Sequence, residues 1–226
     1  MTCKNNKNNK HYKHYNLMFI SSPLDHDIMF GNKDHRDERT MIFIDLDNLQ
    51  NTVSFRNPAI RLDYAMFKEY LEDTFSPRAV YVFDSRECEN TDDPRSRFHN
   101  ALSYMGYRVK LWRCSVDKAG ERYQKCVDTG MVCEILKHLY KDHADNFVII
   151  SGDRDFLPVM DIIHDEGKVS TLICDKEYSS RELMRNADRI LDICNDLPDM
   201  ATLYVPEVQP EQTDLGMFTP VMQEVE

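Results

Sequence analysis

Long apolar runs are absent from this 226-residue sequence, and no stretch approaches the roughly 20 residues that a membrane-spanning helix requires. Residues 1–16 are polar and lack the apolar segment of a secretory signal peptide. None of the seven cysteines belongs to a CxxC pair. An odd number of cysteines without such pairs indicates free thiols in a reducing compartment. We therefore expect a cytoplasmic protein that makes no use of a membrane.

Positive charge is also scarce, since the formal net charge is −11. This balance argues against tight non-specific binding of nucleic acid by the whole surface. The charge is uneven: residues 1–16 carry four lysines and no acid, whereas residues 197–226 carry six acids and no lysine or arginine. We predict a poorly ordered polar leader over 1–39, one folded domain over 40–196, and an acidic, proline-containing tail over 197–226 that binds a protein partner.

Apolar segments rich in β-branched and aromatic residues alternate with segments of helical spacing inside the predicted domain. We expect strands at 41–45, 79–84, 108–114, 146–151, 169–174 and 189–194, and helices at 63–75, 96–106, 126–140, 155–167 and 179–187. Gly106 and Gly167 stand where helix ends are expected. This alternation predicts an α/β fold with a mainly parallel sheet between two helical layers, a three-layer α/β/α, Rossmann-like arrangement.

Aspartates follow four of the predicted strands: Asp45, Asp84, Asp153 and Asp175. The carboxyl ends of parallel strands share one edge of the sheet, where open α/β folds bind ligands. Taken singly, an aspartate in this place is usually a loop residue or the N-cap of the next helix, and we interpret Asp84 and Asp175 in that way.

Asp128 lies in the first turn of the predicted helix at 126–140. The apolar residues that follow it at helical spacing are Met131, Val132, Ile135, Leu136 and Leu139. This spacing predicts that Asp128 heads the buried face of the helix, where an unpaired carboxylate costs on the order of several kcal/mol. A bound cation, or a neighbouring lysine or arginine, would offset that cost. Because a cluster of carboxylates offers only oxygen ligands, the expected metal is Mg²⁺ or Mn²⁺ rather than zinc.

Three stretches resemble the signature segments of the NYN domain family, the LabA-like branch of the PIN-like nucleases. They are FIDLDNL, KCVDTGMVCEIL and VIISGDRDFLPVMDIIHDEGK, in the family's order. The resemblance implies a PIN-like fold and an endoribonuclease, in which a metal-activated water hydrolyses phosphodiester bonds of RNA. It places Asp45, Asp128, Asp153 and Asp155 as the catalytic, metal-binding set. Asn48 and Ser151 are expected to orient these ligands.

Two positions depart from the family pattern. Cys126 stands where the family usually has a glycine and could crowd the approach to Asp128, and Asp47 stands where a small residue is common. We expect Cys126 and Cys133 to be buried free thiols. Pro158 fits the first turn of a helix, which makes Asp155 a candidate N-cap as well as a candidate ligand.

A nuclease on an acidic domain needs local positive charge to hold phosphates. The candidate substrate-binding residues are Arg86, Arg95, Arg97, Lys118, Arg122, Lys125 and Arg154. Tyr123 could stack on a base, as aromatic side chains do with single strands. We therefore expect single-stranded RNA as the partner, and a homodimer would lengthen the substrate groove.

Two alternatives remain open at this point. One is a module of the same fold that binds RNA or protein without turnover. The other is a phosphatase similar to the haloacid dehalogenases, because the segment IDLDN also resembles the first motif of that family. Asp45 would then be the nucleophile and Asp47 the general acid, but Asp128 would have no role.

Overall fold

The computed structural model describes residues 38–56, 60–86, 93–113, 115–116, 122–123, 126–196 and 201–203. Its main feature is a parallel sheet of six strands. In spatial order these are β4 (Arg108–Arg113), β3 (Ala79–Arg86), β1 (Thr40–Asp45), β7 (Asn146–Ile150), β8 (Val169–Cys174) and β9 (Arg189–Asp192). Every pairing between neighbours in this sheet is parallel. The predicted fold class is confirmed.

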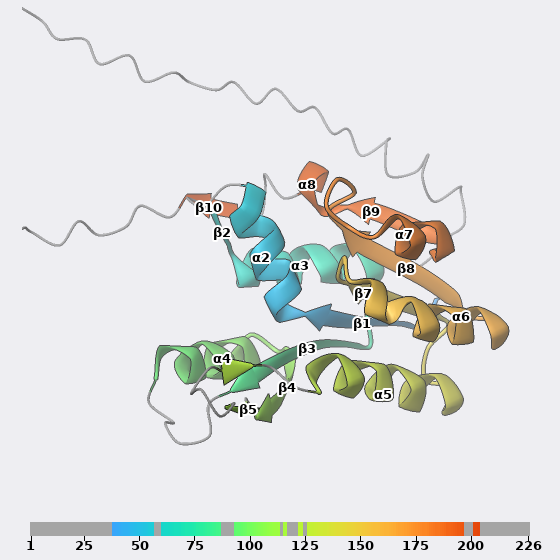
Figure 1. The fold of residues 1–226 in the computed structure, drawn as a ribbon, viewed down its shortest axis with the longest axis horizontal. Helices are drawn as coiled ribbons and strands as arrows, with labels where there is room; N and C mark the ends of the chain where they lie inside the picture. The colour runs from blue at the N-terminus through green and yellow to red at the C-terminus, as the bar shows by residue number, and fades with distance from the viewer. Residues whose placement is uncertain are drawn as a thin grey trace, which may run out of the picture. The chain divides into compact units, whose positions relative to one another are not determined.

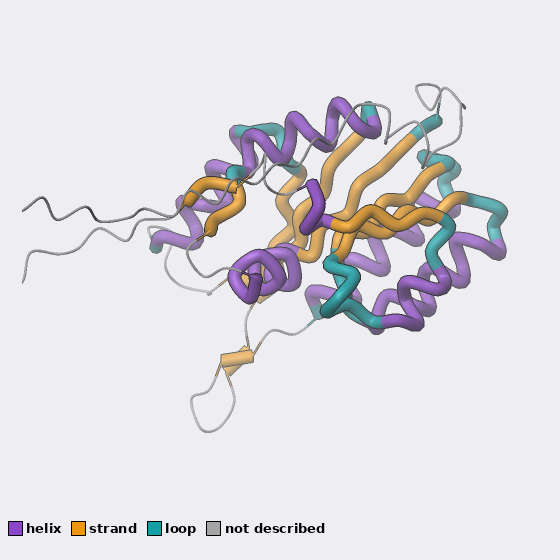
Figure 2. Tube along the Cα trace, turned by 90° about the horizontal axis from the view of Figure 1, so that it is seen from above, coloured by secondary structure: helices purple, strands orange, loops and turns teal. Residues whose placement is uncertain are grey.

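Helices cover both faces of the sheet, as Figures 1 and 2 show. One face packs against α5 (Val127–Tyr140), α6 (Leu157–Asp165) and α7 (Arg181–Asn186), which contribute to a single apolar core cluster. The other face is covered by α2 (Leu46–Arg56), α3 (Tyr64–Phe75) and α4 (Pro94–Tyr104). None of the helices in the part of the chain that the structure describes has both the length and the apolar character needed to cross a membrane.

The central strand β1 is buried along its whole length, which explains its nearly continuous apolar sequence. The Phe43 ring stacks on Tyr81 from β3 and on Phe147 from β7, with ring centroids 5.5 and 6.2 Å apart. These contacts fix the strand between its two neighbours. Asp45 follows Phe43 by two residues at the end of this strand, so its backbone position is fixed by the packing of the core.

Glycines end two of the helices as predicted. Gly106 follows α4 with a φ of 90°, and Gly167 follows α6 with a φ of 67°. In this left-handed region glycine avoids the steric penalty of a Cβ atom. Both glycines turn the chain back toward the start of the next sheet strand, so that β4 and β8 run parallel to the others.

Several elements differ from the sequence prediction. Helix α2 was not predicted, and β9 is followed by a short helix, α8 (Ile193–Asp196), instead of continuing to residue 194. Two small antiparallel pairs were also missed: β2 (Ile60–Leu62) with β10 (Ala201–Leu203), and β5 (Ser115–Val116) with β6 (Arg122–Tyr123). Strand β10 lies inside the region predicted as a tail, so this part of the tail pairs with the domain.

Candidate functional site

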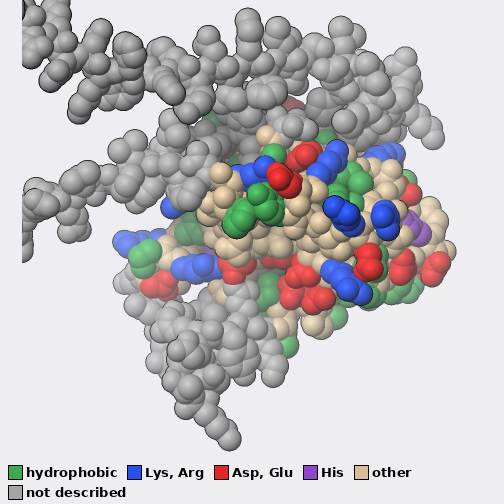
Figure 3. All heavy atoms as spheres, turned by 45° about the horizontal axis from the view of Figure 1, so that its top comes forward, with side chains coloured by type: hydrophobic (Ala, Val, Ile, Leu, Met, Phe, Trp, Pro, Cys, Tyr) green, Lys and Arg blue, Asp and Glu red, His purple; other side chains and the backbone are tan. Residues whose placement is uncertain are grey.

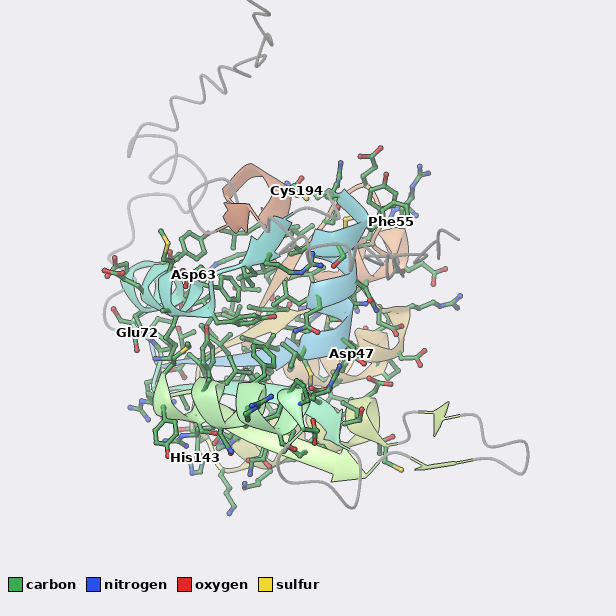
Figure 4. The ribbon with its side chains drawn as sticks, turned by 90° about the vertical axis from the view of Figure 1, so that its left-hand side faces the viewer. Asp47, Phe55, Asp63, Glu72, His143 and Cys194 are labelled. Atoms are coloured by element: carbon green, nitrogen blue, oxygen red, sulfur yellow. The ribbon has the colours of Figure 1, made fainter. Side chains whose placement is uncertain are left out.

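The order of the strands creates one natural site at the carboxyl edge. From β1 the chain moves outward to β3 and β4, and it then crosses back to add β7 on the other side of β1. The loops after β1 and β7 therefore diverge, and such a switch point is where open α/β sheets bind ligands. Asp45 ends β1, and Ser151 follows β7 directly. Figure 4 labels Asp47, which lies two residues after Asp45 at the start of α2 (Leu46–Arg56).

A chain of hydrogen bonds joins the two loops. The Ser151 hydroxyl donates to Asp45 Oδ2 at 3.1 Å and accepts the backbone N–H of Asp153 at 3.1 Å. The backbone N–H of Asn48 donates to Asp45 Oδ1 at 3.2 Å, and the Asn48 side-chain oxygen accepts the N–H of Gly152 at 2.9 Å. The Asn48 backbone and the Ser151 side chain thus hold the Asp45 carboxylate between them, and the Asn48 side chain joins the loop after β1 to the loop after β7.

Asp153 and Asp155 begin the segment that follows. Asp153 accepts the backbone N–H of Asp155 at 3.0 Å and caps a 3₁₀ turn, η2 (Arg154–Phe156), that precedes α6. The prediction that Asp155 is the N-cap of this helix is wrong: Asp153 caps the turn, and α6 begins after Phe156 without a side-chain cap. The Asp155 side chain is left exposed at the edge.

Asp128 lies in the first turn of α5, but it does not head the buried face. Val127 occupies that position, and the buried residues that follow are Met131, Ile135, His138 and Leu139. Asp128 itself is exposed. The buried face begins one residue earlier than predicted, because Val127 fits the same helical spacing as Asp128. Asp128 is thus turned away from the core, and it lies close enough to Asp153 and Asp155 for their charges to add to the desolvation that raises its pKa.

The four predicted acids repel one another. Burial raises the pKa of Asp45 to about 6, and the negative charges of Asp128 and Asp47 contribute to the shift. Partial burial, followed by the charges of Asp153 and Asp155, raises the pKa of Asp128. No three of the four bring carboxylate oxygens within 4.8 Å of one another. Figure 3 shows acidic side chains gathered on the described surface, with basic ones close by.

The other two buried aspartates at this edge have arginine partners. Arg56 donates to both oxygens of Asp175 at 2.5 and 2.6 Å, and Arg95 donates to both oxygens of Asp84 at 3.1 and 2.6 Å. Burial alone would raise the pKa of both aspartates. At Asp84 the hydrogen bonds from His99 and Arg95 outweigh burial, and its pKa is lowered. At Asp175 the hydrogen bonds from Arg56 contribute most to the opposite effect, and its pKa falls to about 2. Asp84 lies within β3, so its interpretation as a loop or capping residue is wrong. Asp175 does lie in the loop after β8, as predicted, where it also accepts the backbone N–H of Glu177 at 2.8 Å.

Asp45 has no such partner. It is only 7% exposed, and no arginine or lysine among the described residues forms an ion pair with it. Its hydrogen bonds come from a serine hydroxyl and a backbone amide. Asp47, two residues further along the chain, pairs with Arg95. A cation bound at Asp45 would supply the compensation that arginine supplies at Asp84 and Asp175, so the residues present fit a divalent metal.

A second group of possible ligands, formed by Asp175, Asp192 and Cys194, does not fit a metal. In this group the ligand atoms lie within 4.8 Å of one another. However, Arg56 occupies both oxygens of Asp175, and the Cys194 thiol donates to Asp175 Oδ2 at 3.2 Å. Burial and the neighbouring Asp175 raise the pKa of Cys194 to about 12. A protonated thiol beside a neutralised carboxylate is a poor ligand.

Cys126 has the backbone conformation of a glycine. Its φ is 69° and its ψ is 8°, in the left-handed region, and it precedes α5 without capping it. Both Cys126 and Cys133 are exposed free thiols, so the prediction that they are buried is wrong. The glycine that the family resemblance leads one to expect here would enter the same turn without the steric penalty of a Cβ atom.

The predicted substrate-binding residues fall into two groups. Arg97 is exposed on α4, and Arg154 is exposed between Asp153 and Asp155, where it pairs with Glu182 at 3.0 Å. Lys118 and Lys125, with the side chains of Arg86, Arg122 and Tyr123, lie outside what the structure describes. Arg95, also a candidate, is engaged with Asp84 and Asp47.

Sequence reasoning missed the role of Arg56 and Arg95 in neutralising buried aspartates. The available signal was weak: Arg95 follows Asp93 and Pro94 at a helix start, and Arg56 ends a helix that the sequence pattern did not predict. Nothing in the local sequence connects Arg56 to Asp175, which lies 119 residues away.

Comparison with known proteins agrees with this description. A crystal structure of a protein of unknown function from Vibrio parahaemolyticus superposes with a TM-score of 0.58 at 22% identity, over 71% of this chain and 95% of that one. The likeness concerns the fold. Comparison with curated proteins gave no match. The family model described as NYN domain matches residues 39–194, which include all four acids of the site. The chain therefore belongs to the NYN domain family, within the PIN-like nuclease superfamily.

Proposed function

We propose that this NYN domain is a divalent-metal-dependent ribonuclease that hydrolyses phosphodiester bonds of single-stranded RNA. The observation that carries the proposal is the contrast at the carboxyl edge. Asp45 is buried and its pKa is raised to about 6, whereas the other two buried strand-end aspartates are neutralised by arginine. Family membership supports the same chemistry.

Asp45 and Asp153 would hold the principal metal, with Asp128 and Asp155 completing the acidic set. Because all donors are carboxylate oxygens, Mg²⁺ or Mn²⁺ fits better than zinc. A metal bound there activates water and neutralises the charge that develops on the phosphate. Ser151 and Asn48 keep the Asp45 carboxylate in one orientation through the hydrogen bonds given above.

The exposed side chains face the incoming substrate. Asp128 and Asp155 are exposed at the edge, and the exposed Arg97 and Arg154 can contact phosphates of the RNA. In the phosphatase alternative Asp47 would be the general acid, but it is engaged with Arg95 in the structure. The cytoplasmic location, the homodimer and a partner of the acidic tail stay predictions.

The test is cleavage of a labelled single-stranded RNA by the full chain with Mg²⁺, with Mn²⁺ and with EDTA. Asp45→Asn and Asp153→Asn should each abolish cleavage. The matched control is Asp165→Asn, an exposed aspartate on α6, which should cleave at the wild-type rate. Cleavage that persists in EDTA or in both site variants would contradict the proposal.

Two further outcomes would identify an alternative function. Hydrolysis of p-nitrophenyl phosphate without RNA cleavage would favour a phosphatase. RNA binding without any hydrolysis, in the presence of either metal, would favour a module that binds without turnover.

A further inference from the structure

We propose that Phe55 and Tyr178 form a platform on which a base of single-stranded RNA stacks, beside the acidic site. This inference deepens the proposed function and depends on it for the identity of the ligand. The two rings lie in contact, with centroids 4.5 Å apart and an interplanar angle of 70°. Phe55 is 67% exposed and Tyr178 is 55% exposed, so both rings keep a large area open to solvent.

Arg56 supports the aromatic pair. The Arg56 guanidinium lies 4.8 Å from the centre of the Tyr178 ring, and it also pairs with Asp175 at 2.5 Å and with Glu177 at 2.7 Å. The positive charge of Arg56 is therefore already neutralised by acids of the chain. We assign this arginine a positioning role: it fixes the loop that carries Tyr178 against the end of α2, which carries Phe55.

The helix that carries Phe55 begins at the acidic site. Helix α2 starts directly after Asp45 and carries Phe55 near its other end, and Figure 4 shows Asp47 and Phe55 at opposite ends of this helix. Eight residues separate these two positions, which is about 12 Å along a helix axis. That length corresponds to about three nucleotides of a stacked strand. A strand with one phosphate at Asp45 can therefore place a nearby base on the rings.

The loop after β8 is joined to the loop of Asp153 as well. The Ser180 N–H donates to the Gly152 carbonyl at 3.1 Å, and a Cβ atom at Gly152 would lie 2.3 Å from Ser179 Oγ. Only a glycine permits this approach. The platform and the acids are consequently fixed relative to one another, which preorganised binding of a strand requires.

A base fits this surface better than a protein does. The other exposed large apolar residues in the described part of the chain are Met66, Tyr104, Met105 and Tyr140, and the ring pairs found there do not join Tyr104 or Tyr140 to Phe55 or Tyr178. Two rings are far smaller than the roughly 800 Å² per partner of a stable protein interface. Stacking on a nucleobase needs only a ring face, and it tolerates any base.

The test measures binding separately from cleavage. In the full chain carrying Asp45→Asn, which prevents hydrolysis, binding of a fluorescent ten-nucleotide oligouridylate is followed by anisotropy. Phe55→Ala and Tyr178→Ala should each weaken binding by about 5- to 100-fold. Tyr178→Phe, which keeps the ring, should bind like its parent. Tyr104→Ala and Tyr140→Ala, which remove exposed rings elsewhere, are the matched controls and should also bind like the parent.

A second probe separates stacking from attraction to the backbone. An abasic ribose–phosphate chain of the same length should bind equally to the parent and to Phe55→Ala. Equal oligouridylate affinity of the parent and both alanine variants would overturn the platform, even if the wild type cleaves RNA. A change of oligomeric state in these variants would overturn it in favour of an interface between copies. If both alanine variants bind oligouridylate more weakly but the wild type cleaves no RNA, the result would support the platform and contradict the proposed nuclease.

Discussion

Asp45 and Asp175 occupy equivalent places in this fold and have opposite electrostatics. Each follows or ends a strand of the same parallel sheet, each is buried, and each faces the carboxyl edge. Asp175 receives two hydrogen bonds from Arg56, and its pKa falls to about 2. Asp45 receives hydrogen bonds only from neutral groups, and its pKa rises to about 6.

The difference shows where the fold supplies its own cation and where, among the described residues, it supplies none. An arginine from α2 compensates Asp175, and an arginine from α4 compensates Asp84. The chain thus has the means to neutralise a strand-end carboxylate at this edge. A carboxylate buried without such compensation destabilises the apoprotein, and this is common at sites that bind a charged ligand.

Removing the arginine from Asp175 should have the largest effect on stability. In Arg56→Ala the buried carboxylate loses its partner, and we expect the free energy of unfolding to fall by about 2–4 kcal/mol. This is somewhat below the range of about 3–5 kcal/mol for fully buried pairs, because the Arg56 side chain is 34% exposed. Urea denaturation measures this change. Arg154→Ala, which breaks an exposed pair with Glu182, should cost less than about 1 kcal/mol. Equal effects of the two substitutions would show that Asp175 is not stabilised as described.

The pH dependence of stability should reveal the uncompensated Asp45. Its pKa is about 6 in the folded protein and about 3.9 in an unfolded chain, so the unfolded chain ionises first. The free energy of unfolding contributed by this group is therefore full below about pH 4 and decreases as the pH rises to about 6, by up to about 3 kcal/mol.

Asp175 follows the opposite sign. Its folded pKa of about 2 lies below the unfolded value, so its contribution to the free energy of unfolding is present above about pH 4 and is lost as the pH falls toward 2.

Urea denaturation in EDTA, compared between wild type and Asp45→Asn, isolates the contribution of Asp45. The difference in unfolding free energy should grow between pH 4 and 6 and stay constant above. A difference that does not vary with pH would contradict the raised pKa.

The same chemical change should have opposite effects at the two kinds of aspartate. At pH 7 without metal, Asp45→Asn should stabilise the fold by about 1–2 kcal/mol, because it removes an unfavourable buried charge at the expense of weaker hydrogen bonds. Asp84→Asn should destabilise it, because Arg95 loses its charged partner. Thermal or urea denaturation in EDTA gives both signs. A loss of stability in Asp45→Asn would place Asp45 among the structural carboxylates.

The smallest expected effect concerns the entrance of α5. Cys126→Gly relieves the left-handed conformation of a residue with a Cβ atom, worth about 1–2 kcal/mol, and the greater freedom of glycine in the unfolded chain offsets about half of this. We expect a net gain below about 1 kcal/mol in urea denaturation. Cys133→Ala, an exposed cysteine inside the same helix, should change stability by less than about 0.5 kcal/mol. A clear loss in Cys126→Gly would indicate a role for the thiol.

The parallel sheet and most helices could be predicted because each has a strong apolar pattern of its own. Strand β1 is buried on both faces and reads as a continuous apolar run, and α5 has a regular buried stripe. Helix α2 could not be predicted in the same way. Its sequence is rich in residues of low helix propensity, and it buries only Leu46, Leu49 and Val53, so contacts with the sheet decide its conformation.

The candidate site was predictable where it follows from strand ends, and unpredictable where it depends on partners distant in sequence. Asp45, Ser151 and Asp153 follow from the rule that parallel strands share a carboxyl edge. The exposure of Asp128 was not predicted, because Val127 and Asp128 fit the same helical spacing and the structure buries Val127. The arginines that neutralise Asp84 and Asp175 arrive by tertiary packing, for which the local pattern carries no signal.

The switch in strand order also decides when the site can form during synthesis. Ser151, which fixes the Asp45 carboxylate, is translated 106 residues after it. A nascent chain that ends before β7 lacks both Ser151 and Asp153. The site is therefore incomplete in such a chain, even when β1, β3 and β4 have already paired. The site is therefore assembled by a late, long-range contact. A nuclease made on a ribosome, next to the message that encodes it, would acquire its activity only after most of its domain has been synthesised.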